Sequence, residues 1–178
     1  LMRDKSGRPV FKLDDAAVRI IETAWKEWCK NPCVTGDMSL NECGRLILRN
    51  TARDGDTLTK YVIDSSANDF GFAIQLFEGD IIDDYKNTMT AATDGQPQSQ
   101  IRMGVERDLW GRIDQLHLFA RHPGDSFWYA GQGWVPEPYP ARMFVYPFVR
   151  DRIGQSVGIP WLTSAGYNLN MIGHYTEA

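Results

Sequence analysis

The sequence of 178 residues contains no run of about 18 apolar residues, the length that a helix needs to cross a bilayer. We therefore expect neither a membrane-spanning helix nor a membrane partner. Residues 1–15 also lack the apolar segment of a signal peptide. The chain does not begin with Met and ends inside a helical pattern, so we expect it to be a piece of a longer protein.

Clustered positive charge is missing as well. Residues 1–60 carry 11 basic and 9 acidic side chains, residues 61–100 carry 1 and 7, and residues 101–178 carry 7 and 7, which gives a net charge of -4. A surface that holds nucleic acid tightly needs a stripe of Lys and Arg to neutralise the phosphates. The charge pattern therefore argues against a DNA-reading protein.

Motifs for nucleophilic catalysis and cofactor binding are absent. There is no G-x-S-x-G motif, and neither Ser126 nor Ser156 has a histidine in a recognisable arrangement. The Gly-x-Gly at 131–133 lacks the strand–turn–helix setting of a dinucleotide loop. We therefore expect no enzymatic activity and no cofactor.

Cysteine is scarce, with only Cys29, Cys33 and Cys43. Structural zinc sites use two matched pairs of ligands, and no second pair accompanies these three residues. Cys43 falls on the predicted inner face of a helix, which favours burial in the core over metal binding. We predict three reduced thiols in a cytosolic compartment and no metal site.

Two alternative functions rest on residues that the sequence does contain. Glu106, Asp108 and Asp114 lie on a predicted hairpin, and converging carboxylates would suit a metal-dependent nucleic-acid hydrolase. No lysine is expected near them, because Lys86 is the only one after residue 60. The aromatic residues of 127–139 would suit a carbohydrate- or peptide-binding module, although packing under a long loop explains them better.

Hydrophobic periodicity predicts two helices in residues 1–56, packed as an antiparallel hairpin. The first spans 13–30 with Asp14 as N-cap, and the second begins at Ser39, where Glu42 completes a capping box. The residues expected to face inward are Val18, Ile21, Trp25 and Trp28 in the first helix, and Leu40, Cys43, Leu46, Ile47 and Asn50 in the second.

The pattern then changes to the alternation that is typical of strands. We predict strands over 57–63 and 72–77, a mobile polar loop over 88–100, and a hairpin of 101–107 with 112–119. Further strands are predicted over 126–130 and 143–149, the latter at an edge because of Pro147. A final helix is predicted over 160–176, with Pro160 in its first turn and an inward face of Leu162, Ala165, Leu169 and Ile172.

This order of elements predicts a single α+β domain over residues 1–178, with an N-terminal helical pair, a mostly antiparallel β-sheet and a C-terminal helix. We divide it into a helical hairpin over 1–56, a sheet region over 57–149, and a segment over 150–178 that comprises a loop and the start of a long helix.

The most constrained stretch is RDRIGQSVGIPWL, residues 150–162, which combines two arginines, two glycines and a proline without any catalytic motif. Glycines let backbones approach closely, a proline sets the start of a helix, and arginines pair bidentately with carboxylates. These properties favour repeated head-to-tail contacts in an assembly. An ordinary strand-to-helix turn with solvated arginines is the alternative.

Three stretches of the second half resemble the portal proteins of tailed bacteriophages of the lambda-like family: IRMGVERDLWGRIDQLHLF, VPEPYPARMFVYPF and RDRIGQSVGIPWLTSAGYNLNMIGHY. The matching positions are Gly104, Val105, Glu106, Asp108, Gly111, Arg112, Pro140, Ala141, Arg152, Gly154, Gln155, Gly158 and Pro160. The Trp-x-x-Trp helix and the RDGD turn at 53–56 are similar to the upstream region of that family. Tyr146 departs from it, because the family usually has histidine there.

The resemblance implies a structural subunit of a portal ring, typically a dodecamer, at one vertex of the capsid of a virion, assembled in the host cytoplasm. Double-stranded DNA would pass through the ring without specific binding, driven by terminase, and the ring would also contact other portal subunits, the capsid and head-completion proteins. This chain would form the outer, wing-like part. The residues expected to shape the motif or to contact neighbouring subunits are Arg150, Arg152, Gly154, Gln155, Gly158, Pro160, Glu106, Asp108, Gly111 and Arg112.

Overall fold

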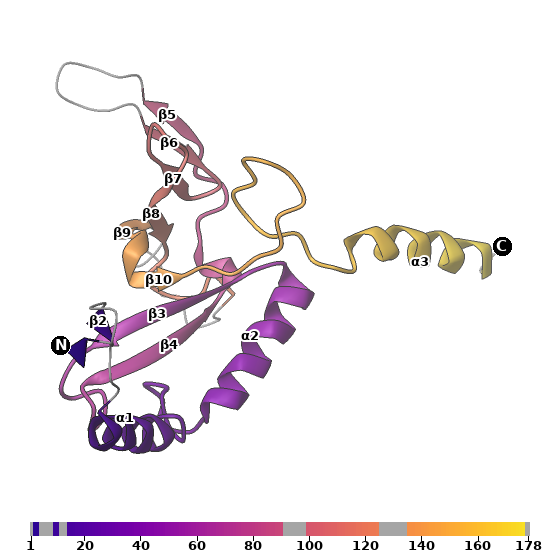
Figure 1. Cartoon of the computed structure of the whole chain (residues 1–178). Helices are drawn as coiled ribbons and strands as arrows, with labels where there is room; N and C mark the ends of the chain where they lie inside the picture. Colours follow the sequence, from indigo (N-terminus) through magenta and orange to yellow (C-terminus); the bar gives the residue numbers. More distant parts are fainter. Residues whose placement is uncertain (1, 4–8, 11–13, 91–98, 125–134, 177–178) are drawn as a thin grey trace.

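A computed structural model of the chain describes residues 2–3, 9–10, 14–90, 99–124 and 135–176. Within these ranges the chain has three α-helices and antiparallel sheets of two, three and five strands (Figure 1). The predicted α+β class is confirmed. The smallest sheet pairs β1 (Met2–Arg3) with β2 (Pro9–Val10). The predicted strand 126–130 and most of the aromatic segment lie outside the described residues.

The three-stranded sheet has the order β10–β3–β4. β3 (Thr57–Ile63) and β4 (Phe72–Glu78) pair along their whole lengths, as the alternation predicts. β10 (Phe144–Val145) lies on the outer edge of β3 and is shorter than the predicted strand. The ladder is interrupted at Pro147, which has no N–H group, and resumes in a single antiparallel bridge between Phe148 and Asp56.

Both N-terminal helices begin at the predicted caps. α1 (Asp15–Trp28) follows Asp14, whose carboxylate accepts hydrogen bonds from two backbone N–H groups of the first turn. α2 (Leu40–Asp54) follows Ser39, whose backbone N–H donates to the Glu42 carboxylate at 2.7 Å in a capping box. These contacts provide partners for N–H groups that the helix itself leaves unpaired.

The two helices do not pack along each other as the predicted hairpin. α2 packs on β3 and β4, and α1 lies crosswise near the N-terminal end of α2 (Figure 1). The linker between the two helices lies against the sheet instead, because Ile74 of β4 exchanges backbone hydrogen bonds with Pro32 and Val34. Ile21 and Trp25 of the predicted inner stripe are therefore 67% and 56% exposed.

Trp28 is the residue of the predicted stripe that does become buried. Its ring stacks on Phe72 with the ring centroids 5.5 Å apart, and its indole N–H donates to the Phe72 carbonyl at 2.7 Å. This combination of aromatic packing and a hydrogen bond attaches the C-terminal end of α1 to β4.

The five-stranded sheet follows the order of the sequence. Its strands are β5 (Thr88–Thr90), β6 (Ser99–Arg102), β7 (Val105–Arg107), β8 (Ile113–Leu118) and β9 (Glu137–Pro140). β5 and the start of β6 fall within the loop predicted over 88–100, and residues 91–98 lie outside the described part of the chain. The sequence does not predict β9, because its two prolines lack the N–H groups that a strand normally uses for pairing. The strand forms because it lies at the edge of the sheet, where hydrogen bonds are needed on one side alone.

The hairpin predicted from 101–107 and 112–119 is two hairpins. The chain first reverses at Met103 and Gly104, whose φ angles are 50° and 71°, so that Arg102 faces Val105. Two residues with positive φ form the tight turn that matches the twist of paired strands. Methionine rarely adopts a positive φ, so the sequence does not indicate this turn. The second reversal, over 108–111, is the predicted one.

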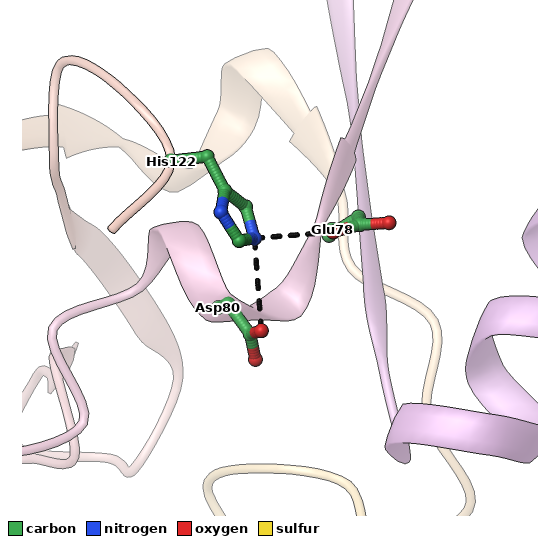
Figure 2. A group of neighbouring side chains, drawn as sticks. All are labelled: Glu78, Asp80 and His122. Atoms are coloured by element: carbon green, nitrogen blue, oxygen red, sulfur yellow. Dashed lines mark ion pairs between the residues drawn. The ribbon is translucent and has the colours of Figure 1, made fainter. Parts of the chain in front are cut away.

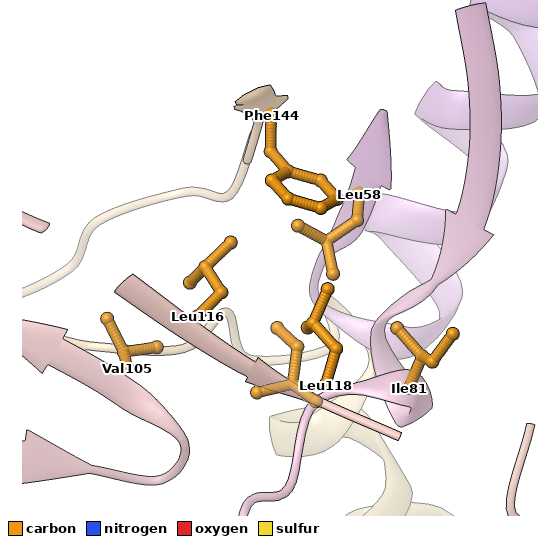
Figure 3. Close-up of a cluster of buried hydrophobic side chains, with 7 residues drawn as sticks. Leu58, Ile81, Val105, Leu116, Leu118 and Phe144 are labelled. Carbon is orange, nitrogen blue, oxygen red and sulfur yellow. The ribbon is translucent and has the colours of Figure 1, made fainter. Parts of the chain in front are cut away.

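Two buried clusters hold these elements together. The larger lies between the three- and five-stranded sheets and joins them through η1 (Gly79–Ile81); it comprises Leu58, Ile81, Ile82, Val105, Leu116, Leu118 and Phe144 (Figure 3). The smaller comprises Trp28, Cys33, Cys43 and Ile74. All three cysteines are free. Cys43 is fully buried, as predicted, and burial raises the pKa of its thiol.

Residues 150–160, called the motif loop below, lead to α3 (Thr163–Thr176), which extends away from the two larger sheets (Figure 1). The helix starts after Pro160 rather than with it, and the Pro160 carbonyl accepts from both the N–H and the hydroxyl of Thr163. Leu162 and Ile172 of the predicted inward face are 72% and 59% exposed. None of the helices in the described ranges combines the length and hydropathy needed to cross a membrane.

The core assignment predicts different costs for two leucines. Leu116 is 1% exposed, whereas Leu109 is 66% exposed. Leu116→Ala should lower the free energy of unfolding by about 2–5 kcal/mol, because it leaves a cavity. Leu109→Ala should change it by less than about 0.5 kcal/mol. Urea unfolding followed by circular dichroism measures both, and equal losses would contradict this assignment.

Candidate functional site: the motif loop and its supports

Gln155 is only 4% exposed, and its side chain forms the centre of the motif loop. Its amide oxygen accepts hydrogen bonds from the backbone N–H groups of Asp151 and Arg152, at 2.8 and 3.4 Å. Its amide nitrogen donates to the carbonyls of Val149 and Val157, at 3.3 and 2.9 Å. A fully partnered buried amide thus fixes the shape of the loop from inside.

Asp56 attaches the motif loop to the end of α2. Its Oδ2 accepts a hydrogen bond from the Tyr146 hydroxyl at 2.6 Å and another from the Gly158 N–H at 3.1 Å. Burial raises the pKa of the Asp56 carboxyl, and the two hydrogen bonds only partly oppose it. Burial and the neighbouring Asp56 also raise the pKa of Tyr146, so that the phenol remains a donor.

Gly158 is required by a close approach within the chain. A Cβ atom at this position would overlap the carbonyl group of Gly55, and Gly55 itself has a φ of 103°. Gly154 differs, because its surroundings are open and its φ of 77° allows the loop to turn. The close contact expected of Gly158 is therefore made inside this chain.

Arg107 connects the β7–β8 turn to the motif loop. Its guanidinium donates to the carbonyls of Gly111 and Gln155, at 2.7 and 2.8 Å. Its buried Nε has no hydrogen-bond partner among the described residues. Burial, followed by the nearby Arg150 and Arg102, lowers the pKa of Arg107. The carbonyls orient this positive charge without neutralising it.

Arg150 and Arg152 are exposed on the outer side of the loop. The Arg150 guanidinium lies 5.3 Å from the centroid of the Phe148 ring. In the part of the chain that the structure describes, neither arginine forms an ion pair with a carboxylate. Both line an open depression together with Arg107, Asp151, Ile153, Gly154 and Gln155.

Asp108 closes the turn between β7 and β8. Its carboxylate accepts hydrogen bonds from the backbone N–H groups of Trp110 and Arg112 and from the Arg112 guanidinium. Gly111 has a φ of 78°, which glycine adopts without strain. These motif residues build the turn, whose exposed side carries Trp110.

Glu106 belongs to a partly buried chain of hydrogen-bonded side chains and not to a carboxylate cluster. Its Oε2 lies 3.0 Å from Nε2 of His117, and Nδ1 of His117 lies 3.0 Å from the Lys86 ammonium. Since lysine only donates, Nδ1 accepts and Nε2 donates to Glu106. The expectation that no lysine lies nearby is wrong, because the Lys86 carbonyl pairs with the Gly104 N–H beside β7.

The hydrolase alternative loses its basis in this geometry. Glu106 pairs in register with Gln115 and not with Asp114, because the register shifts between Glu106 and Arg107. Asp114 is exposed, while Asp108 is occupied by the turn. The three carboxylates therefore do not converge on one point.

A different group of possible metal ligands comprises Glu78, Asp80 and His122, and no other such group of three occurs in the described ranges (Figure 2). Nε2 of His122 lies 3.1 Å from Glu78 Oε2 and 3.6 Å from Asp80 Oδ2. However, Nδ1 of His122 accepts a hydrogen bond from the Gly124 N–H, which places a proton on Nε2. A metal-bound imidazole has the opposite arrangement, so contact with the carboxylates is favoured over a metal.

Asp80 and His122 of this group also line an acidic cleft of about 380 Å³, which lies between the end of α2, η1, Met103 and the far end of the motif loop. Its acidic lining residues are Asp54, Asp56, Asp80 and Asp84, and His122 lies among them. The cleft and the arginines of the motif loop thus lie on neighbouring parts of the chain and carry opposite charge.

Sequence reasoning missed Asp56 and Gly55 as supports of the motif. The signal that points to them is the RDGD turn at 53–56, whose pattern does not show by itself that the motif loop packs against it. Tyr146, noted as a departure from the family pattern, proves to be the donor to Asp56.

Comparison with known proteins places these observations in a family. The family model described as phage portal protein, lambda family, matches residues 2–178. The chain is also similar to a probable portal protein of Halomonas phage phiHAP-1, with 31% identity over 179 residues. That match covers 99% of this chain and 33% of the phage protein, so the chain spans about a third of the length of that relative.

The contact between Gly158 and Gly55 predicts a specific sensitivity. Gly158→Ala should lower the free energy of unfolding by about 1–3 kcal/mol, because its Cβ would overlap the Gly55 backbone. Gly44→Ala is the control, since Gly44 lies in α2 with open space around it and alanine favours helix by about 0.5–1 kcal/mol. Urea unfolding distinguishes the two, and a Gly158→Ala variant as stable as wild type would exclude this contact.

The raised pKa of Asp56 predicts a pH dependence. Above about pH 4, the ordinary pKa of aspartate, the folded chain binds more protons at this carboxyl than the unfolded chain does. The unfolding free energy of the wild type should therefore fall as the pH rises from about 4 through the raised pKa, and Asp56→Asn should lack this part of the fall. The exposed Asp69→Asn is the control for loss of one charge. Denaturant titrations over this pH range provide the measurement. A wild type whose unfolding free energy rises with pH, relative to that of Asp56→Asn, would refute the prediction.

Proposed function

This chain belongs to the lambda family of phage portal proteins, and on that premise we propose that it is a non-catalytic structural part of a portal ring. The ring would form the conduit for DNA packaging and ejection at the capsid vertex and would join head to tail. The observation that carries this proposal is the family match along residues 2–178.

The chemistry of the motif supports a structural role. Gln155, Asp108 and Glu106 each direct their polar atoms to groups of the same chain. Catalysis needs groups held within reach of a substrate, and these groups are already occupied. The motif residues therefore serve the shape of the backbone, which is what repeated subunit contacts require.

The charge distribution supports passage of DNA without retention. The net charge is -4, and a negatively charged protein repels a phosphate backbone. A conduit that bound DNA tightly would slow its movement. We propose that terminase, the capsid and head-completion proteins contact the whole assembly, and that the ring is part of the virion.

Exposed apolar side chains support contacts beyond this chain. Trp161 and Leu162 before α3 are 53% and 72% exposed, and Trp110 at the β7–β8 turn is 81% exposed. Large exposed apolar groups are typical of surfaces that other protein segments cover. In the proposed ring, these would be neighbouring subunits or the remaining part of the same protein.

The test is assembly of the full-length portal subunit. Purified protein should form closed rings with a central channel, seen by negative-stain electron microscopy and confirmed in mass by native mass spectrometry. The rings should neither retain linear double-stranded DNA at physiological salt nor cleave it with Mg²⁺ or Mn²⁺. A subunit that remains monomeric at high concentration, or one that cleaves DNA, would refute the proposal.

A further inference from the structure

We infer that neighbouring subunits are joined by the tip of the motif loop, residues 150–154, which inserts into the acidic cleft of the next copy. This inference rests on the proposed function, since a closed ring needs a head-to-tail contact between two different surfaces of the same chain. The loop tip and the acidic cleft are two such surfaces with complementary charge and shape.

The loop tip projects and carries positive charge. In Figure 1 the chain between β10 and α3 stands out as a separate loop beside the five-stranded sheet. Arg150 and Arg152 are exposed on it, and Ile153, directly after Arg152, is completely exposed. Gly154 turns the chain directly after this residue with a φ of 77°. An isoleucine that follows two arginines is thus presented to the outside.

The positive charge of the tip is not balanced locally. Arg107, Arg150 and Arg152 line the same depression, in which Asp151 is the only acidic residue among the described lining residues. Guanidinium groups bind carboxylates through paired, charge-assisted hydrogen bonds. Three guanidinium groups with one carboxylate therefore favour an acidic partner.

The acidic cleft has the opposite character. It is concave, and Asp54, Asp56, Asp80 and Asp84 contribute four carboxylates to its lining. Asp80 is within reach of a partner, because 72% of its side chain is exposed, and Asp84 is also exposed. The apolar lining residues Ile82, Met103 and Val157 provide a surface for Ile153 of a neighbouring copy.

The loop tip is held ready for such a contact. Gln155 fixes the loop from inside, and Asp56 anchors its far end at Gly158. A rigid loop loses little conformational entropy on docking, which favours binding. The volume of about 380 Å³ is many times the roughly 30 Å³ occupied by one water molecule, so the cleft can admit side chains.

A second copy explains the tip better than DNA does. Proteins that hold duplex DNA make about 6–10 phosphate contacts, whereas this tip offers two arginines beside an aspartate and the chain as a whole is acidic. The complementary acidic surface is present on the same polypeptide.

Two charge-reversed variants of the full-length subunit test the inference. The first carries Arg150→Glu and Arg152→Glu in the loop tip, and the second carries Asp80→Lys and Asp84→Lys in the acidic cleft. Each alone would place like charges at every junction, so the fraction of protein in rings should fall at least about tenfold. Mixed in equal amounts, the two should form rings again, because opposite charges then meet wherever the variants alternate.

The composition of the mixed rings is the decisive measurement. Native mass spectrometry of variants with different mass tags should show equal numbers of the two in each ring. The control carries Arg19→Glu and Arg45→Glu, two exposed arginines on α1 and α2, and should form rings like the wild type. Circular dichroism and thermal melting establish that each variant folds.

The outcomes separate the inference from the proposed function. If both variants form rings as the wild type does, or if folded variants fail to form rings on mixing, the inference is wrong while the portal function stands. If the loop-tip variant forms normal rings but packages less DNA, its arginines contact DNA, which also overturns the inference. If the wild type forms no rings, the proposed function itself fails.

Discussion

The buried carboxylate of Asp56 is the interaction on which the site depends. It joins the end of α2 to Tyr146 and Gly158, which lie 90 and 102 positions further along the chain. A buried carboxylate without donors would be costly, and here two donors from distant segments supply its partners. Because Gly55 and Gly158 let the backbones approach beside it, the three-stranded sheet, α2 and the motif loop are held in one arrangement.

The motif that marks the family divides into residues that face inward and residues that face outward. Gln155 and Gly158 satisfy hydrogen-bonding and steric demands of the loop itself. Arg150, Arg152 and Ile153 meet no such demand and are exposed. This division explains why a highly constrained stretch contains no catalytic group: its constraint is geometric, and the rigid inner part determines how the outer part is presented.

The helices at both ends of the chain show what an amphipathic pattern does and does not establish. The apolar stripe of α1 and the apolar residues around α3 indicate faces that need to be covered. In the described chain Ile21 and Leu162 stay exposed, because the linker of α1 is bound to β4 and α3 extends away from the sheets. Such a pattern identifies the face but not the partner that covers it.

The sequence by itself determined the features whose cause lies within a few residues: the helix starts at Asp14 and Ser39, the alternation of β3 and β4, and the motif that shows the family. Only the tertiary structure decided the additional hairpin at Met103, the hydrogen-bonded side chains from Lys86 through His117 to Glu106, and the contact of Gly55 with Gly158. Caps and alternation are local hydrogen-bonding and burial effects, so they leave a readable pattern. Contacts between distant segments leave none, because they depend on where the whole chain places those segments in space.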